Sequence, residues 1–367
     1  MPKLFLTIFF FLCFTQLHNR VLCCYTSIFS FGDSLADTGN LKSSKHSEDY
    51  YDHYPYGETF FGKPTGRCSD GRLVIDFIAE ALGLPLMPPY LGQTNPDFSQ
   101  GMNFAVAGAT ALDVEILEGK GVKIPTNLSL GVQIQWFKQL LPTFCNSPTN
   151  CRNFFLTTLL LVGEIGGNDY NYPFFQGKDL QEIHSIVPDV IKTISMTIKD
   201  LIEEGAVTLV VPGNLPIGCS AAYLTQFKTD NKDAYDPLTG CLNWLNEFSQ
   251  YHNQLLQNEL NRLREMYPHV RIIYADYYNA AMELYQSPKE LGFTNTITAC
   301  CGGGGPYNYN VSAYCTYEGS NLCSDVSSYV SWDGIHLTEK AYRLIANGIL
   351  KGPYAIPRID MSCKSDI

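Results

Sequence analysis

The sequence contains little positive charge. Lys and Arg together number 25 and Asp and Glu number 36, so the formal net charge at pH 7 is −11. A chain with this balance repels the phosphates of nucleic acids and other polyanions. We therefore expect no nucleic-acid partner, although the charge alone identifies no substrate.

Several motifs of well-known functional classes are also missing. No Gly-x-Ser-x-Gly occurs, which excludes the nucleophile elbow of α/β-hydrolases. The glycine run 302–305 has no strand before it and no Lys-Ser/Thr after it, which excludes a phosphate-binding loop. No Cys-x-x-Cys pair is present, so a structural zinc site is not expected, and the sequence indicates no metal and no cofactor.

The chain also lacks a Pro/Ser-rich linker, a block of charge and an internal repeat. Because α/β folds of this size are often one domain, we expect a single domain over residues 25–367. Before it, a basic start and the apolar run 4–14 are typical of a secretory signal peptide. We assign residues 1–24 to this leader, with cleavage between Asn19 and Cys24, and expect a secreted protein without a stable membrane anchor. The alternative is an uncleaved anchor.

Cysteine, in contrast, is abundant, with 13 residues in the chain. In an oxidising compartment such cysteines form disulfides, and short loops favour the pairs Cys145–Cys151 and Cys219–Cys241. A further cluster consists of Cys300, Cys301, Cys315 and Cys323. The sequence leaves the pairing within this cluster open, and zinc ligation is its less favoured alternative.

Two glycosylation sequons agree with secretion. They are Asn127-Leu128-Ser129 and Asn310-Val311-Ser312. Glycosylation of Asn127 or Asn310 would require each asparagine to lie in an exposed loop.

Short apolar runs alternate with longer amphipathic stretches along the chain. We expect strands over 27–30, 159–162, 207–211 and 270–274, and helices over 73–82, 186–203, 242–266 and 341–350. This alternation predicts right-handed βαβ crossovers and a mostly parallel sheet with helices on both faces. The fold class is therefore α/β, with three layers in the order α/β/α.

Polar residues follow each predicted strand, at the edge where α/β folds bind ligands. They are Ser34, Asn168, Asn214 and Asp276. For Asn214 and Asp276 the alternative is that each caps the next helix. The small-residue segment 101–110 allows the backbone to approach a ligand or a neighbouring element closely, and its alternative role is tight helix-to-sheet packing.

The segment Gly32-Asp33-Ser34-Leu35 places a serine hydroxyl directly after the first strand. Alone, this pattern is also that of a strand followed by a helix N-cap. Near the C-terminus, Asp333 precedes His336 by three residues across Gly334. A turn there brings the carboxylate to one imidazole nitrogen, so that the other nitrogen can deprotonate a serine.

Two irregular segments are candidates for pocket walls. The aromatic loop 50–62 either covers an apolar ligand or packs beneath its own backbone. The segment 286–331 has the pattern of an irregular surface segment that its cysteines hold in place. The other histidines beyond the leader lack an Asp-x-x-His turn, and we interpret them as solvated or structural; they are His46, His53, His184, His252 and His269.

Four segments together resemble the sequence blocks of the GDSL esterase/lipases, also called SGNH hydrolases. In order they are Gly32-Asp33-Ser34-Leu35, Gly108 within 103–109, Gly167-Asn168-Asp169 and Asp333-Gly334-Ile335-His336. Pro55-Tyr56-Gly57, Ser69-Asp70-Gly71-Arg72 and Cys300-Cys301-Gly302-Gly303 resemble the secreted plant branch. Ala107 is a departure, because many relatives carry a second glycine there.

The resemblance implies a flavodoxin-like fold and a role for each motif residue. Ser34 would be the nucleophile, His336 the base and Asp333 the residue that orients it. Gly108 and Asn168, with the N–H of Ser34, would form the oxyanion hole.

Relatives in this branch act on acetyl or hydroxycinnamoyl esters of specialised metabolites, including an acetylesterase of indole alkaloid metabolism. We therefore expect a secreted esterase with a small-molecule ester as its substrate. The alternatives are acyl transfer from the same acyl-enzyme, lipase action on longer chains, and a binding or defence protein that keeps the fold without catalysis. The sequence predicts no oligomeric state.

Overall fold

The computed structural model describes residues 25–44, 50–93 and 97–361. The leader predicted for residues 1–24 lies outside this range, as does His46. Within the described ranges, no helix is both long and apolar enough to cross a membrane.

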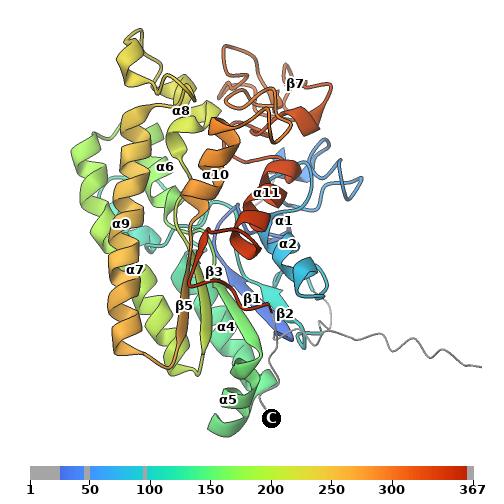
Figure 1. The fold of residues 1–367 in the computed structure, drawn as a ribbon, viewed down its shortest axis with the longest axis vertical. Coiled ribbons are helices and arrows are strands. Elements are labelled where there is room, and N and C mark those ends of the chain that lie inside the picture. The colour runs from blue at the N-terminus through green and yellow to red at the C-terminus, as the bar shows by residue number, and fades with distance from the viewer. Residues whose placement is uncertain (1–24, 45–49, 94–96, 362–367) are drawn as a thin grey trace, which may run out of the picture.

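A six-stranded sheet runs through the middle of the molecule (Figure 1). Its strands are, in spatial order, β2 (Gly101–Asn103), β1 (Ser27–Phe31), β3 (Thr158–Val162), β4 (Thr208–Pro212), β5 (Arg271–Ala275) and β8 (Ala355–Ile356). The first five are parallel, and β8 pairs antiparallel with β5 at the edge. The order 2-1-3-4-5 is that of flavodoxin-like folds, so the predicted fold is confirmed.

The four predicted strands lie within one residue of β1, β3, β4 and β5. In the observed strands β1, β3, β4 and β5 every residue except Arg271 is buried, as expected for a parallel sheet covered on both faces. The sequence did not predict β2, whose three residues are too few for a recognisable pattern. Gly101 pairs with Ile28, and any Cβ on Gly101 would clash with the backbone of Ile28. The close backbone approach expected of segment 101–110 therefore occurs at this strand pair.

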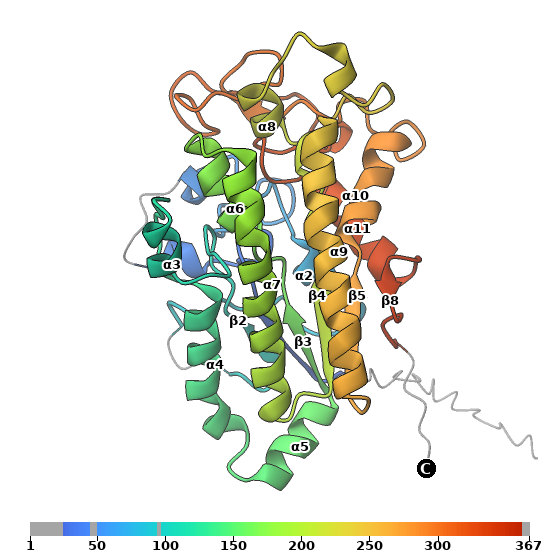
Figure 2. The same ribbon diagram turned by 90° about the vertical axis from the view of Figure 1, so that its left-hand side faces the viewer.

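Helices cover both faces of the sheet and complete the three layers. One face carries α4 (Leu130–Phe144), α7 (Leu180–Glu203) and α9 (Asn243–Met266), in front of the sheet in Figure 2. The other face carries α2 (Val74–Ala81), α10 (Tyr277–Gln286) and α11 (Glu339–Leu350).

Two apolar cores separate these layers. Alternate residues of β1 point into different cores, Phe29 and Phe31 toward α4 and Ile28 toward α2. Helix α7 begins six residues before its predicted start, where Asp179 forms a capping box with Glu182.

The remaining elements are short and lie mostly in the connections. They are α1 (Asn40–Ser43), α3 (Val114–Gly119), α5 (Pro148–Leu156), α6 (Gly167–Phe175), α8 (Ala221–Gln226), β6 (Cys301–Gly302) and β7 (Asn321–Leu322). Segments from distant parts of the chain gather at the upper end of the molecule in Figure 1, where β7 and α8 lie.

Within the part of the chain that the structure describes, four disulfides hold the connections. The predicted pairs Cys145–Cys151 and Cys219–Cys241 are present. The cluster whose pairing the sequence left open forms two disulfides, Cys300–Cys323 and Cys301–Cys315. Each of the four sulfurs is therefore bonded to one other cysteine of the cluster.

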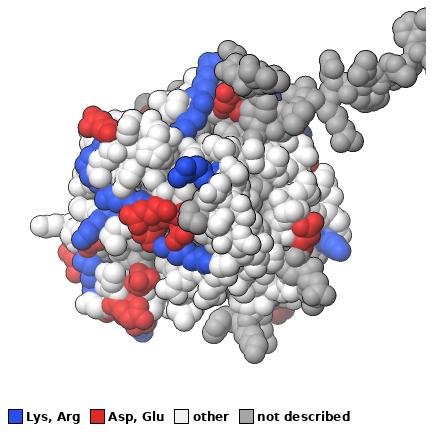
Figure 3. All heavy atoms as spheres, turned by 90° about the horizontal axis from the view of Figure 1, so that it is seen from below, with Lys and Arg blue, Asp and Glu red and all other residues white. Residues whose placement is uncertain are grey.

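Charged groups of both signs are mixed on the face opposite this upper end (Figure 3). Ion pairs also join α4 to the C-terminal end of α7, where Lys138 lies 3.1 Å from Asp200 and 3.7 Å from the C-cap residue Glu204. All three side chains are partly exposed, so these pairs contribute little stability. This face is therefore not a basic surface.

Candidate active site

The predicted serine lies at the point where the strand order reverses. Ser34 follows β1, and Asn168 follows the neighbouring β3, while β2 lies on the other side of β1. In doubly wound sheets the loops diverge at this point and leave a crevice for a ligand. The topology thus brings Ser34 and Asn168 to one crevice.

Asp333, His336 and Ser34 form a continuous chain of hydrogen bonds. His336 Nε2 lies 2.8 Å from Ser34 Oγ, and His336 Nδ1 lies 2.7 Å from Asp333 Oδ2. The three residues are at most 9% exposed. This arrangement brings a hydroxyl, a base and a buried carboxylate into the order that activates a serine.

A tight turn holds Asp333 and His336 in place. Asp333 Oδ1 accepts hydrogen bonds from the N–H groups of Ile335 and His336, at 3.0 and 2.8 Å. Gly334 has a φ of 99°, and a Cβ there would lie 2.5 Å from the ring of Tyr309. Glycine is therefore required at 334 both by the backbone conformation and by the packing of Tyr309.

Tyr56 is a site residue that sequence reasoning did not identify. Its hydroxyl donates to Asp333 Oδ2 over 2.8 Å, and its ring packs edge-on against Trp332. In the same aromatic loop, Tyr51 lies against the ring of His336. Tyr56 therefore packs beneath the loop, as one of the two alternatives predicted, whereas Tyr51 lines the crevice. That the loop covers an apolar ligand stays a prediction.

The environment of Asp333 keeps its carboxyl ionised. Burial acts to raise the pKa of Asp333, but the charge of His336 and the hydrogen bonds from His336 and Ile335 outweigh it, so the pKa lies below its usual value. A charged Asp333 favours the His336 tautomer that carries its proton on Nδ1, which leaves Nε2 free to accept the proton of Ser34.

Asp37 ties the loop after β1 to the loop that carries Gly108. Its carboxylate accepts hydrogen bonds from the N–H groups of Gly39, Asn40, Leu41 and Ala107. The loops that present Ser34 and Gly108 are therefore held by one side chain. Asp37 lies in the same sequence segment as Ser34. Its hydrogen bond with Ala107 joins positions 70 residues apart, and no sequence pattern predicted that contact.

Three N–H groups are available for an oxyanion. Among the described residues, the backbone N–H groups of Ser34 and Gly108 donate to no protein acceptor. The side chain of Asn168 donates to Ala109 O at 3.0 Å and accepts from Asn171, which orients its amide and leaves one N–H. Ser34, Gly108, Asn168 and His336 line the same cavity.

A second group of buried carboxyls lies beside Ser34. Asp33 and Glu164 contact each other, and Asp169 accepts from the N–H groups of Ala111 and Leu112. Burial raises the pKa of Asp33 to about 6 and that of Asp169 to about 7. Burial and the neighbouring carboxyl of Asp33 raise the pKa of Glu164 well above its usual value. Sequence reasoning did not identify Glu164 as part of the site.

Two cavities flank Ser34. The larger has a volume of about 570 Å³ and is lined by Gly108, His336 and several aromatic side chains. The smaller has a volume of about 70 Å³ and is lined by Asp33, Glu164 and apolar side chains of the loop after β4. Ser34 and Asn168 line both cavities.

The other polar residues that follow strands lie outside these cavities. Asp276 caps α10 by accepting from the N–H of Asn279, as its alternative prediction stated. Asn214 is buried, and its backbone is held by the side chain of Asn253. His252 is structural, because it is buried against the hydroxyl of Tyr170, and burial lowers its pKa to about 3.

Asn127 and Asn310 are exposed, as glycosylation requires, and their glycosylation stays a prediction. Over the described ranges, no group of three or more His, Cys, Asp or Glu side chains is arranged to hold a metal ion.

Comparison with known proteins identifies the family. A model of the GDSL-like lipase/acylhydrolase family matches residues 28–349. GDSL esterase/lipase At1g31550 of Arabidopsis thaliana is 57% identical over 346 residues, which are 94% of this chain and 88% of that protein. Sinapine esterase of Brassica napus is 54% identical over 345 residues, 92% of this chain and 88% of that protein. The chain therefore belongs to the GDSL-like lipase/acylhydrolase family and is a carboxylic ester hydrolase.

Proposed function

We propose that this chain is a secreted serine esterase that hydrolyses an acetyl or hydroxycinnamoyl ester of a small plant metabolite. The observation that carries the proposal is the chain of hydrogen bonds from Asp333 through His336 to Ser34. We further propose that residues 25–367 form one domain after removal of the leader.

The first half of the reaction forms an acyl-enzyme. Ser34 Oγ attacks the ester carbonyl carbon, and its proton passes to His336 Nε2. The bond between the carbonyl carbon and the alcohol oxygen then breaks, and His336 returns the proton to the leaving alcohol. In the second half, water attacks the acyl group and gives its proton to His336. The bond between the acyl carbon and Ser34 Oγ breaks, His336 returns the proton to that oxygen, and the acid leaves.

Negative charge develops on the carbonyl oxygen in both halves. The N–H groups of Ser34 and Gly108 and the amide of Asn168 stabilise it, and one such donor contributes about 3 kcal/mol. The hydroxyl of Tyr172 donates to Gly108 O at 2.7 Å, which holds this peptide in the crevice. The proposal is supported by the backbone N–H groups of Ser34 and Gly108, which have no protein acceptor among the described residues.

Secretion is supported by the covalent structure. Eight of the described cysteines are joined in four disulfides, a number typical of proteins that fold in an oxidising compartment. The ester class is supported by the relatives, one of which is named as a sinapine esterase.

Removal of the Ser34 hydroxyl tests the proposal. With p-nitrophenyl acetate as substrate, Ser34→Ala should lose turnover by about 10³-fold or more, because no nucleophile remains. The matched control is Ser99→Ala, which changes an exposed serine and should keep wild-type turnover. Equal turnover by wild type and Ser34→Ala would contradict the serine mechanism.

A further inference from the structure

The two cavities beside Ser34 differ in the catalytic groups that they contact. His336 and Gly108 line the larger cavity, of about 570 Å³. The smaller cavity, of about 70 Å³, contacts Ser34 and Asn168 but neither His336 nor Gly108. The base therefore faces one cavity and not the other.

This difference indicates which half of an ester substrate, the alcohol or the acyl group, occupies each cavity. In the proposed reaction, His336 Nε2 must reach the oxygen of the leaving alcohol in order to protonate it. The alcohol therefore lies in the larger cavity, on the side of His336. The acyl substituent points away from the base, into the smaller cavity.

The smaller cavity is much narrower than the larger one, with a volume of about 70 Å³ against about 570 Å³. Apart from the carboxyls of Asp33 and Glu164, its walls are mainly apolar, and they include Leu35, Leu215 and Ile217. A short aliphatic acyl group matches this narrow space and these walls.

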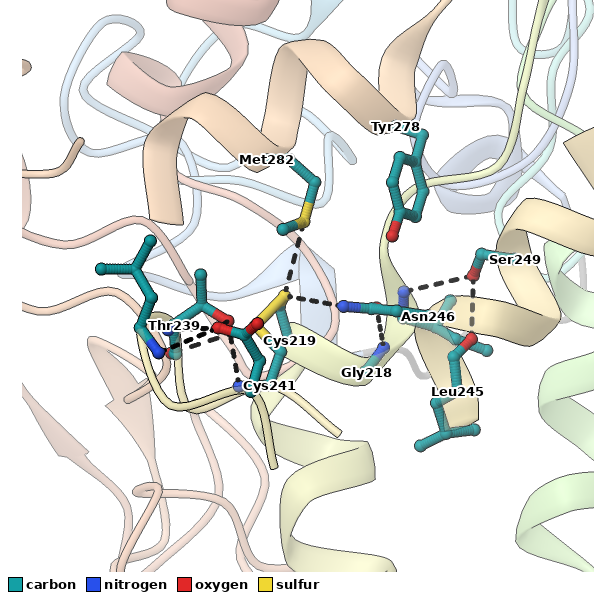
Figure 4. The surroundings of a disulfide bond; sticks show 12 residues. Gly218, Cys219, Thr239, Cys241, Leu245, Asn246, Ser249, Tyr278 and Met282 are labelled. Carbon is teal, nitrogen blue, oxygen red and sulfur yellow. Dashed lines mark hydrogen bonds between the residues drawn. A yellow bond between two sulfur atoms is a disulfide. The ribbon is translucent and has the colours of Figure 1, made fainter. Parts of the chain in front are cut away.

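The wall formed by the loop after β4 is braced against widening. The side chain of Asn253 bonds both the N–H and the C=O of Asn214, and Asn246 accepts from the N–H of Gly218. The disulfide Cys219–Cys241 closes the same loop. Figure 4 shows this disulfide with Asn246 on one side of Cys219 and Met282 on the other.

The larger cavity has the opposite character. Its aromatic lining comes from the loop before α2, from α6 and from the disulfide-stapled segment 300–323. The rings are those of Tyr51, Tyr172, Phe175, Tyr309 and Tyr314. Aromatic walls favour a flat or apolar group of substantial size.

Building on the esterase function proposed above, we propose that the enzyme releases a short aliphatic acyl group from a bulky aromatic alcohol. The proposal selects acetyl over hydroxycinnamoyl as the acyl group. An aromatic group of the substrate belongs to the alcohol.

Two isomeric esters test this assignment on the wild-type enzyme. In 2-phenylethyl acetate the aromatic group is in the alcohol, and in methyl 3-phenylpropanoate it is in the acyl group. Both are alkyl esters of similar intrinsic reactivity. We expect kcat/KM to be about 100-fold higher for the acetate, because the larger acyl group does not fit the smaller cavity. A preference for the propanoate would overturn the assignment while leaving the esterase function intact. If the enzyme fails to hydrolyse either of these esters and also fails to hydrolyse p-nitrophenyl acetate, the esterase function itself is contradicted.

A variant that widens the smaller cavity tests the role of its wall. Leu215→Ala should raise kcat/KM for p-nitrophenyl hexanoate relative to the acetate by about tenfold, since a pocket discriminates by about this factor per methylene. The matched control is Tyr314→Ala in the larger cavity, which should leave this acyl-length ratio at its wild-type value. A change of the ratio in Tyr314→Ala but not in Leu215→Ala would reverse the assignment.

Discussion

Four carboxyls are buried beside the same serine, and their pKa values are shifted in opposite directions. Asp333 has a pKa below its usual value, whereas Asp33, Glu164 and Asp169 have raised pKa values. All four are at most 7% exposed. Burial raises the pKa of each of them, so burial alone does not decide the direction of the net shift.

The neighbours of each carboxyl account for the difference. Asp333 faces the imidazole of His336 and accepts hydrogen bonds from backbone N–H groups and from Tyr56. Burial raises the pKa values of Asp33, Glu164 and Asp169, and the interactions that lower the pKa values of Asp33 and Asp169 do not outweigh it. The charge of Asp33 raises the pKa of Glu164 further, whereas the hydrogen bond with Glu164 lowers the pKa of Asp33. We conclude that Asp333 is kept charged beside His336, whereas Asp33, Glu164 and Asp169 ionise at higher pH than ordinary carboxyls.

The largest effect should come from removing the charged carboxyl. Asp333→Asn places an amide against His336 Nδ1 and favours the wrong tautomer, so kcat should fall by about 10³- to 10⁴-fold. The comparison variant is Asp33→Asn, which changes a carboxyl with a raised pKa and should reduce kcat by less than about tenfold. Steady-state rates with p-nitrophenyl acetate measure both. Equal losses in the two variants would remove the distinction between the two groups.

A smaller effect should follow from removing one hydrogen bond to Asp333. Tyr56→Phe deletes the hydroxyl that donates to Asp333 Oδ2, and a hydrogen bond to a charged group contributes about 1.5–3 kcal/mol. We expect kcat to fall about tenfold at unchanged KM. The pKa of Asp333 should rise, which moves the acid limb of the pH–rate profile to higher pH.

Tyr278→Phe is the matched control for this variant. Its hydroxyl accepts from Gln250 at 2.8 Å, and it lines neither cavity beside Ser34. It should leave the pH–rate profile in place. An unshifted profile in Tyr56→Phe would mean that the tyrosine only fills space.

The smallest effect concerns stability as a function of pH. A carboxyl with a raised pKa binds protons in the folded state that the unfolded chain releases, so the free energy of unfolding falls as the pH rises from about 4 to about 7. Glu164→Gln removes one such group. The decrease in Tm between pH 5 and pH 8 should become smaller by about 2 °C or more.

The control for this measurement is a carboxyl whose pKa is lowered instead of raised. Glu259 has a pKa lowered mainly by its hydrogen bonds with Arg262. A lowered pKa stabilises the folded state above the pKa of the unfolded chain, so Glu259→Gln should not make the decrease smaller. A steeper decrease in Glu164→Gln would contradict the raised pKa of Glu164.

The sequence predicted the parts of the site that depend on local pattern. Ser34 follows an apolar run, and the turn that joins Asp333 to His336 spans four residues, so both were visible without tertiary information. The central strands were predicted within one residue because burial on both faces makes them continuously apolar. The disulfides Cys145–Cys151 and Cys219–Cys241 close short loops and were predicted for that reason.

Contacts between distant segments had no such signal. Tyr56 reaches Asp333 across 277 residues, and Glu164 meets Asp33 only because β1 and β3 are neighbours. Adjacent cysteines at 300 and 301 offer two equivalent ways to pair with Cys315 and Cys323, and only the folded backbone selects one of them.

The disulfide-stapled segment 300–323 has one more consequence. The N–H groups of Cys300 and Cys301 donate to the carbonyls of Ser331 and Trp332, directly before the Asp333 turn. The segment that carries two disulfides and the aromatic side chains Tyr309 and Tyr314 is therefore bonded, backbone to backbone, to the residues that lead into the Asp333 turn. One wall of the larger cavity and the position of His336 consequently depend on the same covalently closed segment.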